Sequence, residues 1–124
     1  MIQPQELRIG NYVFDIDGDV LQIGQILDIG VKFKNTSLSS RYEKIKPIPL
    51  TEEILLKFRY KKIRDNEFLF DNHFIIFIKE SKIDFCLFNS EGNDFFVCEI
   101  QFAHELQNLH YSIRKEELKF KDIS

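Results

Sequence analysis

The sequence contains no tryptophan and only two cysteines, Cys86 and Cys98, each inside an apolar run. That setting is typical of small core residues, and two thiols are too few for a disulfide-rich scaffold. The longest unbroken apolar run, residues 74–78, is far shorter than the ~20 residues that a membrane-spanning helix needs. The N-terminal residues lack the basic and apolar regions of a signal peptide. We therefore expect a cytoplasmic protein with reduced cysteines and no membrane association.

Motifs for catalysis and cofactor binding are also missing. The sequence has no glycine-rich nucleotide-binding loop and no nucleophile elbow. His104 and Glu105 begin a zinc-protease-like pattern, but Asn108 stands where the second histidine should be. His110 points about 120° away around the helix, and the other histidine and the cysteines lack metal-ligand spacing. We therefore predict no catalytic residue, no metal site and no cofactor, while an enzyme site that forms only in three dimensions remains an alternative.

Residues 15–19, Asp-Ile-Asp-Gly-Asp, resemble the start of a calcium-binding loop. The EF-hand pattern requires glycine at the sixth position and glutamate at the twelfth, and these positions are Val20 and Ile26 here. An Asp-Gly pair supplies the positive φ angles that a tight hairpin turn needs. The segment therefore favours a β-hairpin turn over a calcium site.

Phenylalanine is abundant, with 13 residues in a chain of 124, and the formal net charge is only −3. A chain of this length buries roughly two-thirds of its unfolded surface, which is enough for a core without disulfides or metal. Most of the phenylalanine rings should lie in that core because they carry no polar group. The small net charge does not indicate a polyanionic partner for the whole chain.

The first 48 residues have the pattern of short strands joined by tight turns. Alternation of apolar and polar residues is clearest at 29–34, and the other strands are expected at 11–15, 20–27 and 42–48, with a polar loop over 35–40. This pattern predicts a small SH3-like curled antiparallel sheet.

The rest of the chain predicts a helix, a meander and a second helix. Thr51 is a good N-cap for the first helix, and Leu50 and Leu55 occupy the positions of a hydrophobic staple. Closely spaced turn signals from residue 65 to residue 94 indicate antiparallel hairpins over residues 58–100.

The second helix is expected over residues 101–113. Its apolar stripe should pack on the sheet of the meander, and it consists of Phe102, Leu106, Leu109 and Ile113. A charged tail follows over residues 115–124, with Leu118 and Phe120 as anchors. The predicted class is therefore α+β, with a lobe at 1–48 and a helix–meander–helix unit at 49–124 that share one core.

Two segments are candidate contact surfaces. The opposite face of the second helix carries His104, Gln107, Asn108 and Tyr111, a composition more typical of a protein-contact surface than of a solvated face. Packing of this face against the N-terminal lobe or the tail is an equal alternative. Residues 57–64 hold five cations with interleaved aromatic side chains, a composition suited to nucleic acid. The candidate nucleic-acid patch consists of Lys57, Arg59, Tyr60, Lys61, Lys62 and Arg64. The favoured interpretation of the same segment is a helix end followed by a charged edge strand.

Three stretches, residues 6–13, 47–55 and 104–109, together resemble a family of small uncharacterised proteins found in Bacteroidetes genomes and in their phages or prophages. The resemblance spans nearly the whole chain and implies a cytoplasmic, mobile-element or accessory context. It implies no activity and no functional residue. Members of that family tend to have glycine after the Lys-Phe pair that ends the first helix, and Arg59 stands there in this chain. A glycine-type helix cap is therefore not expected.

These observations lead to three functional hypotheses. The first is a non-enzymatic protein-interaction module, such as a phage or prophage accessory protein that binds a host or phage protein or itself. The second is nucleic-acid binding through residues 57–64. The third is an enzyme whose site is not visible in the sequence.

Overall fold

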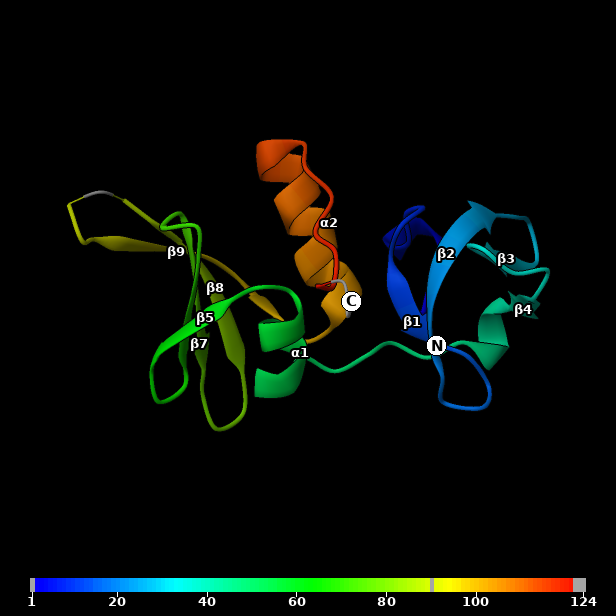
Figure 1. Cartoon of the computed structure of the whole chain (residues 1–124), viewed down its shortest axis with the longest axis horizontal. Coiled ribbons are helices and arrows are strands. Elements are labelled where there is room, and N and C mark those ends of the chain that lie inside the picture. The colour runs from blue at the N-terminus through cyan, green and yellow to red at the C-terminus, as the bar shows by residue number, and fades with distance from the viewer. Residues whose placement is uncertain (1, 90, 122–124) are drawn as a thin grey trace. The chain divides into compact units, whose positions relative to one another are not determined.

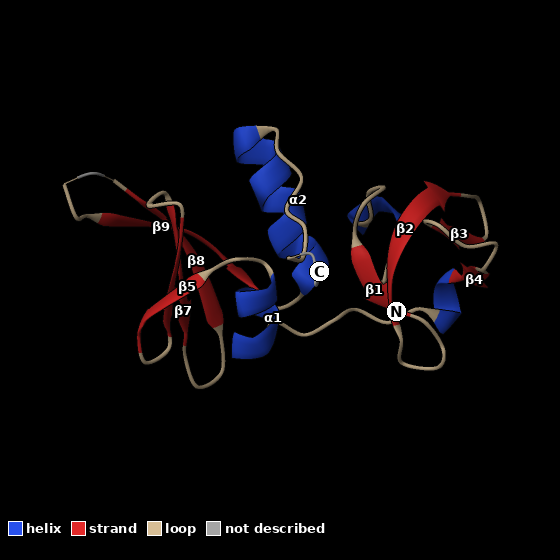
Figure 2. Ribbon diagram, in the orientation of Figure 1, coloured by secondary structure: helices blue, strands red, loops and turns tan. Residues whose placement is uncertain are grey.

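The computed structural model describes residues 2–89 and 91–121, and within them the chain forms two antiparallel sheets and two α-helices (Figures 1 and 2). The predicted α+β class is confirmed. Residues 122–124, which end the predicted tail and the predicted second unit, lie outside the described residues. Among the described residues, no helix has both the length and the apolar character needed to cross a membrane.

The first sheet has four strands in the order β1-β2-β3-β4, and it confirms the predicted SH3-like curled sheet. A short 3₁₀ helix, η1 (Pro4–Glu6), precedes it. The buried apolar side chains of this sheet include Val13, Ile23 and Val31, which form one cluster with residues of the flanking segments. The strands are β1 (Tyr12–Phe14), β2 (Val20–Ile26), β3 (Gly30–Phe33) and β4 (Ser39–Arg41).

One predicted strand of this lobe is wrong. Residues 42–48 do not form a strand, and β4 (Ser39–Arg41) instead overlaps the end of the segment expected to be a polar loop. The chain turns through the 3₁₀ helix η2 (Tyr42–Lys44), after which Lys46 makes a single bridge with Phe14. Tyr42 is buried, and its hydroxyl donates a hydrogen bond to the carbonyl oxygen of Leu27. This inward turn of Tyr42 explains why the extended pattern does not continue as a strand.

The second sheet is the predicted meander, with five strands in the order β5-β6-β7-β8-β9, all antiparallel (Figure 2). Buried phenylalanines, among them Phe58, Phe68 and Phe85, form much of its core. The turn residues Asn66, Asp71 and Asn72 adopt positive φ, as hairpin turns require. The strands are β5 (Lys61–Arg64), β6 (Glu67–Phe70), β7 (Phe74–Ile78), β8 (Ile83–Phe88) and β9 (Asp94–Ile100).

Helix α1 (Glu52–Lys57) begins as predicted. The Thr51 side chain accepts a hydrogen bond of 3.2 Å from the backbone N–H of Ile54, and Leu50 and Leu55 are both buried. The helix ends in a Schellman motif, because the Tyr60 N–H bonds to the Leu55 carbonyl and the Arg59 N–H to the Leu56 carbonyl, both at 3.0 Å. Arg59 takes the left-handed conformation of this motif, with a φ of 72°. The glycine-type cap therefore forms without glycine.

We expect Arg59→Gly to raise the free energy of unfolding by about 0.5–1 kcal/mol, because glycine adopts positive φ without the steric cost of a Cβ atom. The measurement is urea unfolding followed by circular dichroism. Arg59→Ala is the matched control, since it removes the same charge but keeps Cβ. Equal stabilisation by both variants would show that charge, rather than backbone conformation, causes the gain.

By its contacts the chain divides into two compact units, and the division differs from the expected one in the position of the second helix. Helix α2 (Ala103–Arg114) belongs with the first sheet, in a unit of residues 1–49 and 102–118. The second unit comprises residues 50–101 and 119–124. In the expected stripe, Leu106 is buried but Ile113 is 43% exposed. Burial in α2 follows a different stripe, which consists of Ala103, His104, Leu106, Gln107 and His110.

Candidate protein-contact site

The predicted contact face of α2 lies largely inside the first unit. His104 is 1% exposed and Gln107 is fully buried, whereas Asn108 is half-buried and Tyr111 is 42% exposed. The prediction of an exposed face is therefore wrong for His104 and Gln107. The alternative weighed from the sequence, packing against the N-terminal lobe and the tail, describes what the structure shows.

The amide of Gln107 joins three segments of the chain. Its Oε1 accepts a hydrogen bond of 2.9 Å from the backbone N–H of Tyr12, at the start of β1. Its Nε2 donates to the carbonyl oxygens of Gly10 and Leu118, each at 2.9 Å. A buried amide with both ends bonded in this way stabilises the fold, because its partners are backbone groups that would otherwise lose their bonds. Gln107 is therefore a structural residue of the first unit.

Arg8 covers the remaining part of the predicted face. Its guanidinium forms an ion pair of 3.0 Å with Glu117 and donates a hydrogen bond of 2.9 Å to Asn108. The same group lies 4.3 Å from the ring centroid of Tyr111, within the range of a cation–π contact. The Asn108 amide also donates to the Glu6 carbonyl oxygen at 2.8 Å. The amides of Gln107 and Asn108 and the ring of Tyr111 thus have partners within their own chain.

Two buried histidines of α2 make the first unit sensitive to acid. Burial, and then the nearby Arg114, lower the pKa of His110 from 6.5 to about 3. Burial also lowers the pKa of His104, although Glu6 and Glu105 act in the opposite direction. Neither ring nitrogen of His104 has a hydrogen-bond partner within the described residues, and Glu6 Oε1 lies 3.6 Å from its Nε2.

We expect the free energy of unfolding to fall as the pH drops from about 6.5 towards 3. In that window the unfolded chain binds a proton at His110, whereas the native protein does not, and the lowered pKa of His104 acts in the same direction. At pH 5 His110 alone lowers the free energy of unfolding by about 2 kcal/mol relative to neutral pH, with a pKa of about 6.5 for this histidine in the unfolded chain. Urea unfolding at pH 7 and pH 5 measures this effect. His110→Gln should reduce the pH dependence, and exposed His73→Gln should not; equal slopes in both variants would refute the assignment.

The structure does not support the basic cluster as a base-stacking surface. Tyr60 is 2% exposed, and burial raises the pKa of its hydroxyl well above the ordinary value. Lys62 pairs with Glu52 at 3.1 Å, and Arg64 pairs with Glu67 at 3.3 Å. Arg59 and Lys61 are exposed, and Lys57 forms an ion pair of 3.7 Å with Glu53. The segment is a helix end followed by a charged edge strand, which is the interpretation favoured from the sequence.

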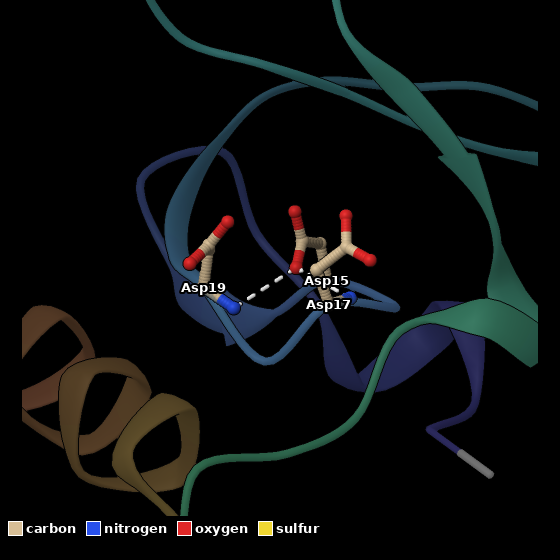
Figure 3. A group of neighbouring side chains, drawn as sticks. All are labelled: Asp15, Asp17 and Asp19. Carbon is tan, nitrogen blue, oxygen red and sulfur yellow. Dashed lines mark hydrogen bonds between the residues drawn. The ribbon is translucent and has the colours of Figure 1, made fainter.

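The three aspartates at residues 15–19 form the turn between β1 and β2, as predicted. Figure 3 shows Asp15, Asp17 and Asp19 at the tip, where their carboxylates lie within 4.8 Å of one another. Oδ1 of Asp15 accepts hydrogen bonds of 2.9 Å from the backbone N–H groups of Asp17 and Asp19. Gly18 supplies a φ of 82°. Turn geometry therefore accounts for these residues without an ion.

A surface hollow of about 710 Å³ lies beside the turns of the second sheet, and its lining offers one imidazole and two amide side chains. Among the lining residues that the structure describes, none carries a carboxylate, thiol or hydroxyl group that could act with the imidazole as a catalytic pair. Its lining residues are Asn72, His73, Phe88, Asn89 and Gly92.

The open edge of the second sheet is the apolar surface that the sequence analysis did not single out. Strand β9 ends the sheet, and among the described residues only β8 pairs with it (Figure 1). Phe95 is 56% exposed, Phe96 is 61% exposed and Val97 is 40% exposed. Other exposed apolar side chains, such as Ile16 and Ile29, are not part of such a run. Three consecutive apolar side chains on an unpaired edge form a candidate docking strand.

The two edges of this sheet differ in their chemistry. At the opposite end, β5 carries Lys61, Lys62 and Arg64, and lysine at an edge is a common means of preventing strand association. Strand β9 carries neither lysine, arginine nor proline. The charged edge is therefore protected against pairing, whereas the apolar edge is not.

The register places the side chains of β9 on the two faces of the sheet. Phe96 pairs with Cys86 and Glu99 pairs with Asp84, so the ring and this carboxylate share a face, and alternation adds Asp94. Phe95, which pairs with Leu87, lies on the other face. A β-bulge between the Phe96 and Cys98 pairs leaves Val97 as the extra residue.

The sequence contained a signal for this edge. Residues 95–100 were expected to be the last strand of a meander, and the last strand of a meander lies at a sheet edge. The run Phe-Phe-Val breaks the apolar–polar alternation of a half-buried strand. Taken together, these two features indicate an exposed apolar edge.

The sequence matches no family model, and neither a curated protein nor a solved structure matches it. The candidate site therefore depends on the geometry of this chain alone.

Proposed function

We propose that this protein is a non-enzymatic interaction module that binds another protein at the open edge of β9. The observation that carries the proposal is the exposure of Phe95, Phe96 and Val97 on an edge strand whose one neighbour, among the described strands, is β8. An edge strand presents backbone N–H and C=O groups in a row, and an added strand would satisfy them. The flanking apolar side chains would then be removed from water, which favours association.

We place the interaction surface on β9 and not on α2, because side chains of the α2 face already bond to other segments of their own chain, and Arg8, which covers this face, pairs with Glu117. The resemblance to small proteins of Bacteroidetes phages and prophages favours an accessory role, in which the partner is a host or phage protein. Binding of nucleic acid by residues 57–64 receives less support, since Tyr60 is buried and several of the cations are paired.

Affinity capture from lysate of the native cell tests the proposal, followed by binding measurements with each purified partner. The informative variant is Phe95→Ser with Phe96→Ser, which removes two exposed rings without opening a cavity in the core. We expect it to weaken partner binding at least tenfold.

The matched control is Ile16→Ser with Ile29→Ser, which removes exposed apolar side chains of the first unit that are 65% and 68% exposed. This double variant should bind like the unchanged protein. The proposal fails if the lysate yields no partner whose binding depends on Phe95 and Phe96.

A further inference from the structure

We infer that the segment docking on β9 is an extended strand of another protein, in which lysine or arginine residues flank a short apolar run. The inference rests on the proposed function and adds the chemistry of the partner. It follows from the charge of the edge, the arrangement of side chains along β9 and the lack of lysine and arginine in β9 itself.

The hairpin that forms this edge is acidic. Residues 83–101 contain Asp84, Glu91, Asp94 and Glu99 but no lysine or arginine. Two preceding lysines partly offset these charges: Lys79 bonds to Asp84 at 2.7 Å, and Lys82 lies 3.8 Å from Glu99. The exposed carboxylates of Asp94 and Glu99 flank Phe96 on one face of β9. An added strand would therefore meet an apolar ring between two anionic groups.

Cross-strand neighbours decide which added strand fits. Opposite charges across a strand pair stabilise it and like charges destabilise it, each by about 0.2–1 kcal/mol. A partner with an apolar residue beside Phe96 and cations beside Asp94 and Glu99 satisfies all three positions. On the other face, Phe95 calls for a second apolar residue. The bulge at Val97 interrupts the regular register, so the segment must be short or must itself be irregular.

A second copy of the same strand fits this pattern poorly. Strand β9 carries neither lysine nor arginine, so no register of a self-paired β9 edge places a cation beside Asp94 or Glu99, and the register that sets Phe96 beside Val97 sets these two carboxylates opposite each other. Strand β5 of another copy carries three cations, but Lys62 and Arg64 already pair with acids of their own chain, which leaves Lys61 where the pattern needs two cations. A separate protein with free cations is therefore the favoured occupant.

Fluorescence anisotropy with the full chain and two labelled seven-residue peptides tests the inference. One peptide has a run of three valines between two lysines, the other has the same run between two glutamates, and both peptides end in serine. We expect the lysine peptide to bind at least tenfold more tightly at low salt, with an affinity that falls as salt screens the charges. Asp94→Asn with Glu99→Gln should reduce this preference to within about threefold, because it removes the two flanking carboxylates at unchanged shape.

The possible outcomes separate the inference from the proposed function. If both peptides bind equally and the Phe95→Ser, Phe96→Ser variant binds neither, the charge preference is overturned. The proposed docking at the β9 edge is then still supported. Binding of neither peptide, or binding that this variant does not change, would overturn both. Sedimentation that shows the chain self-associating through Phe95 and Phe96 would identify a second copy as the occupant and would also overturn the inference.

Discussion

Replacing Gly30 with alanine should lower the free energy of unfolding by about 3 kcal/mol or more, because the new Cβ atom has no space. That atom would lie 2.0 Å from the carbonyl oxygen of Ser40 and 2.8 Å from the Cα atom of Arg41. Both contacts are with backbone, so no flexible side chain can move aside. Relief of the clash requires β3 and β4 to separate where Gly30 pairs with Arg41.

The matched control is Gly18→Ala, at the tip of the β1–β2 turn. A Cβ atom at Gly18 meets nothing within 4 Å, but the residue has a φ of 82°, which alanine adopts only with strain. We expect this variant to lower the free energy of unfolding by only about 1 kcal/mol. Urea unfolding followed by circular dichroism compares the two variants. If Gly30→Ala lowers the free energy of unfolding no more than Gly18→Ala does, the close approach of β3 and β4 at Gly30 is refuted.

The second large effect is expected for Gln107→Leu, which has a similar volume but no amide. The substitution removes the acceptor of the Tyr12 N–H and the donor to the carbonyl oxygens of Gly10 and Leu118. Leaving buried backbone groups without these bonds costs about 1–3 kcal/mol for each group. We therefore expect a total loss of about 3 kcal/mol in the free energy of unfolding.

Gln25→Leu provides the control for this change, because Gln25 is exposed on β2. The same chemical substitution there should change the free energy of unfolding by no more than about 0.5 kcal/mol. Urea unfolding of both variants gives the comparison. Similar losses at the two positions would contradict the structural role assigned to the Gln107 amide.

Local features of the sequence were enough to predict much of the fold. The cap at Thr51 and the turn at Gly18 depend on residues adjacent in the chain, so their propensities identify them directly. The antiparallel meander follows in the same way from closely spaced turns. Arg59 shows the limit of this reasoning, because the Schellman motif imposed positive φ on a residue that does not favour it.

The position of α2 could not be predicted because it depends on contacts between distant parts of the chain. Gln107 bonds to Tyr12, which is 95 residues away, and Arg8 bonds to Glu117, which is 109 residues away. A polar helix face normally indicates exposure to solvent. Here the N-terminal segment supplies enough partners for the polar face to be buried, and the candidate contact surface shifts from α2 to β9.

Hydrogen exchange at the backbone amides of β9 tests the central claim most directly. In the free protein, the amides of residues 94–97 that do not bond to β8 should exchange much faster than those of the central strand β7. The peptide with valines between two lysines should slow exchange at these β9 amides at least tenfold and leave the amides of β5 unchanged. If the β9 amides are already as protected as those of β7, or if the peptide protects another strand, the β9 edge is not the docking site.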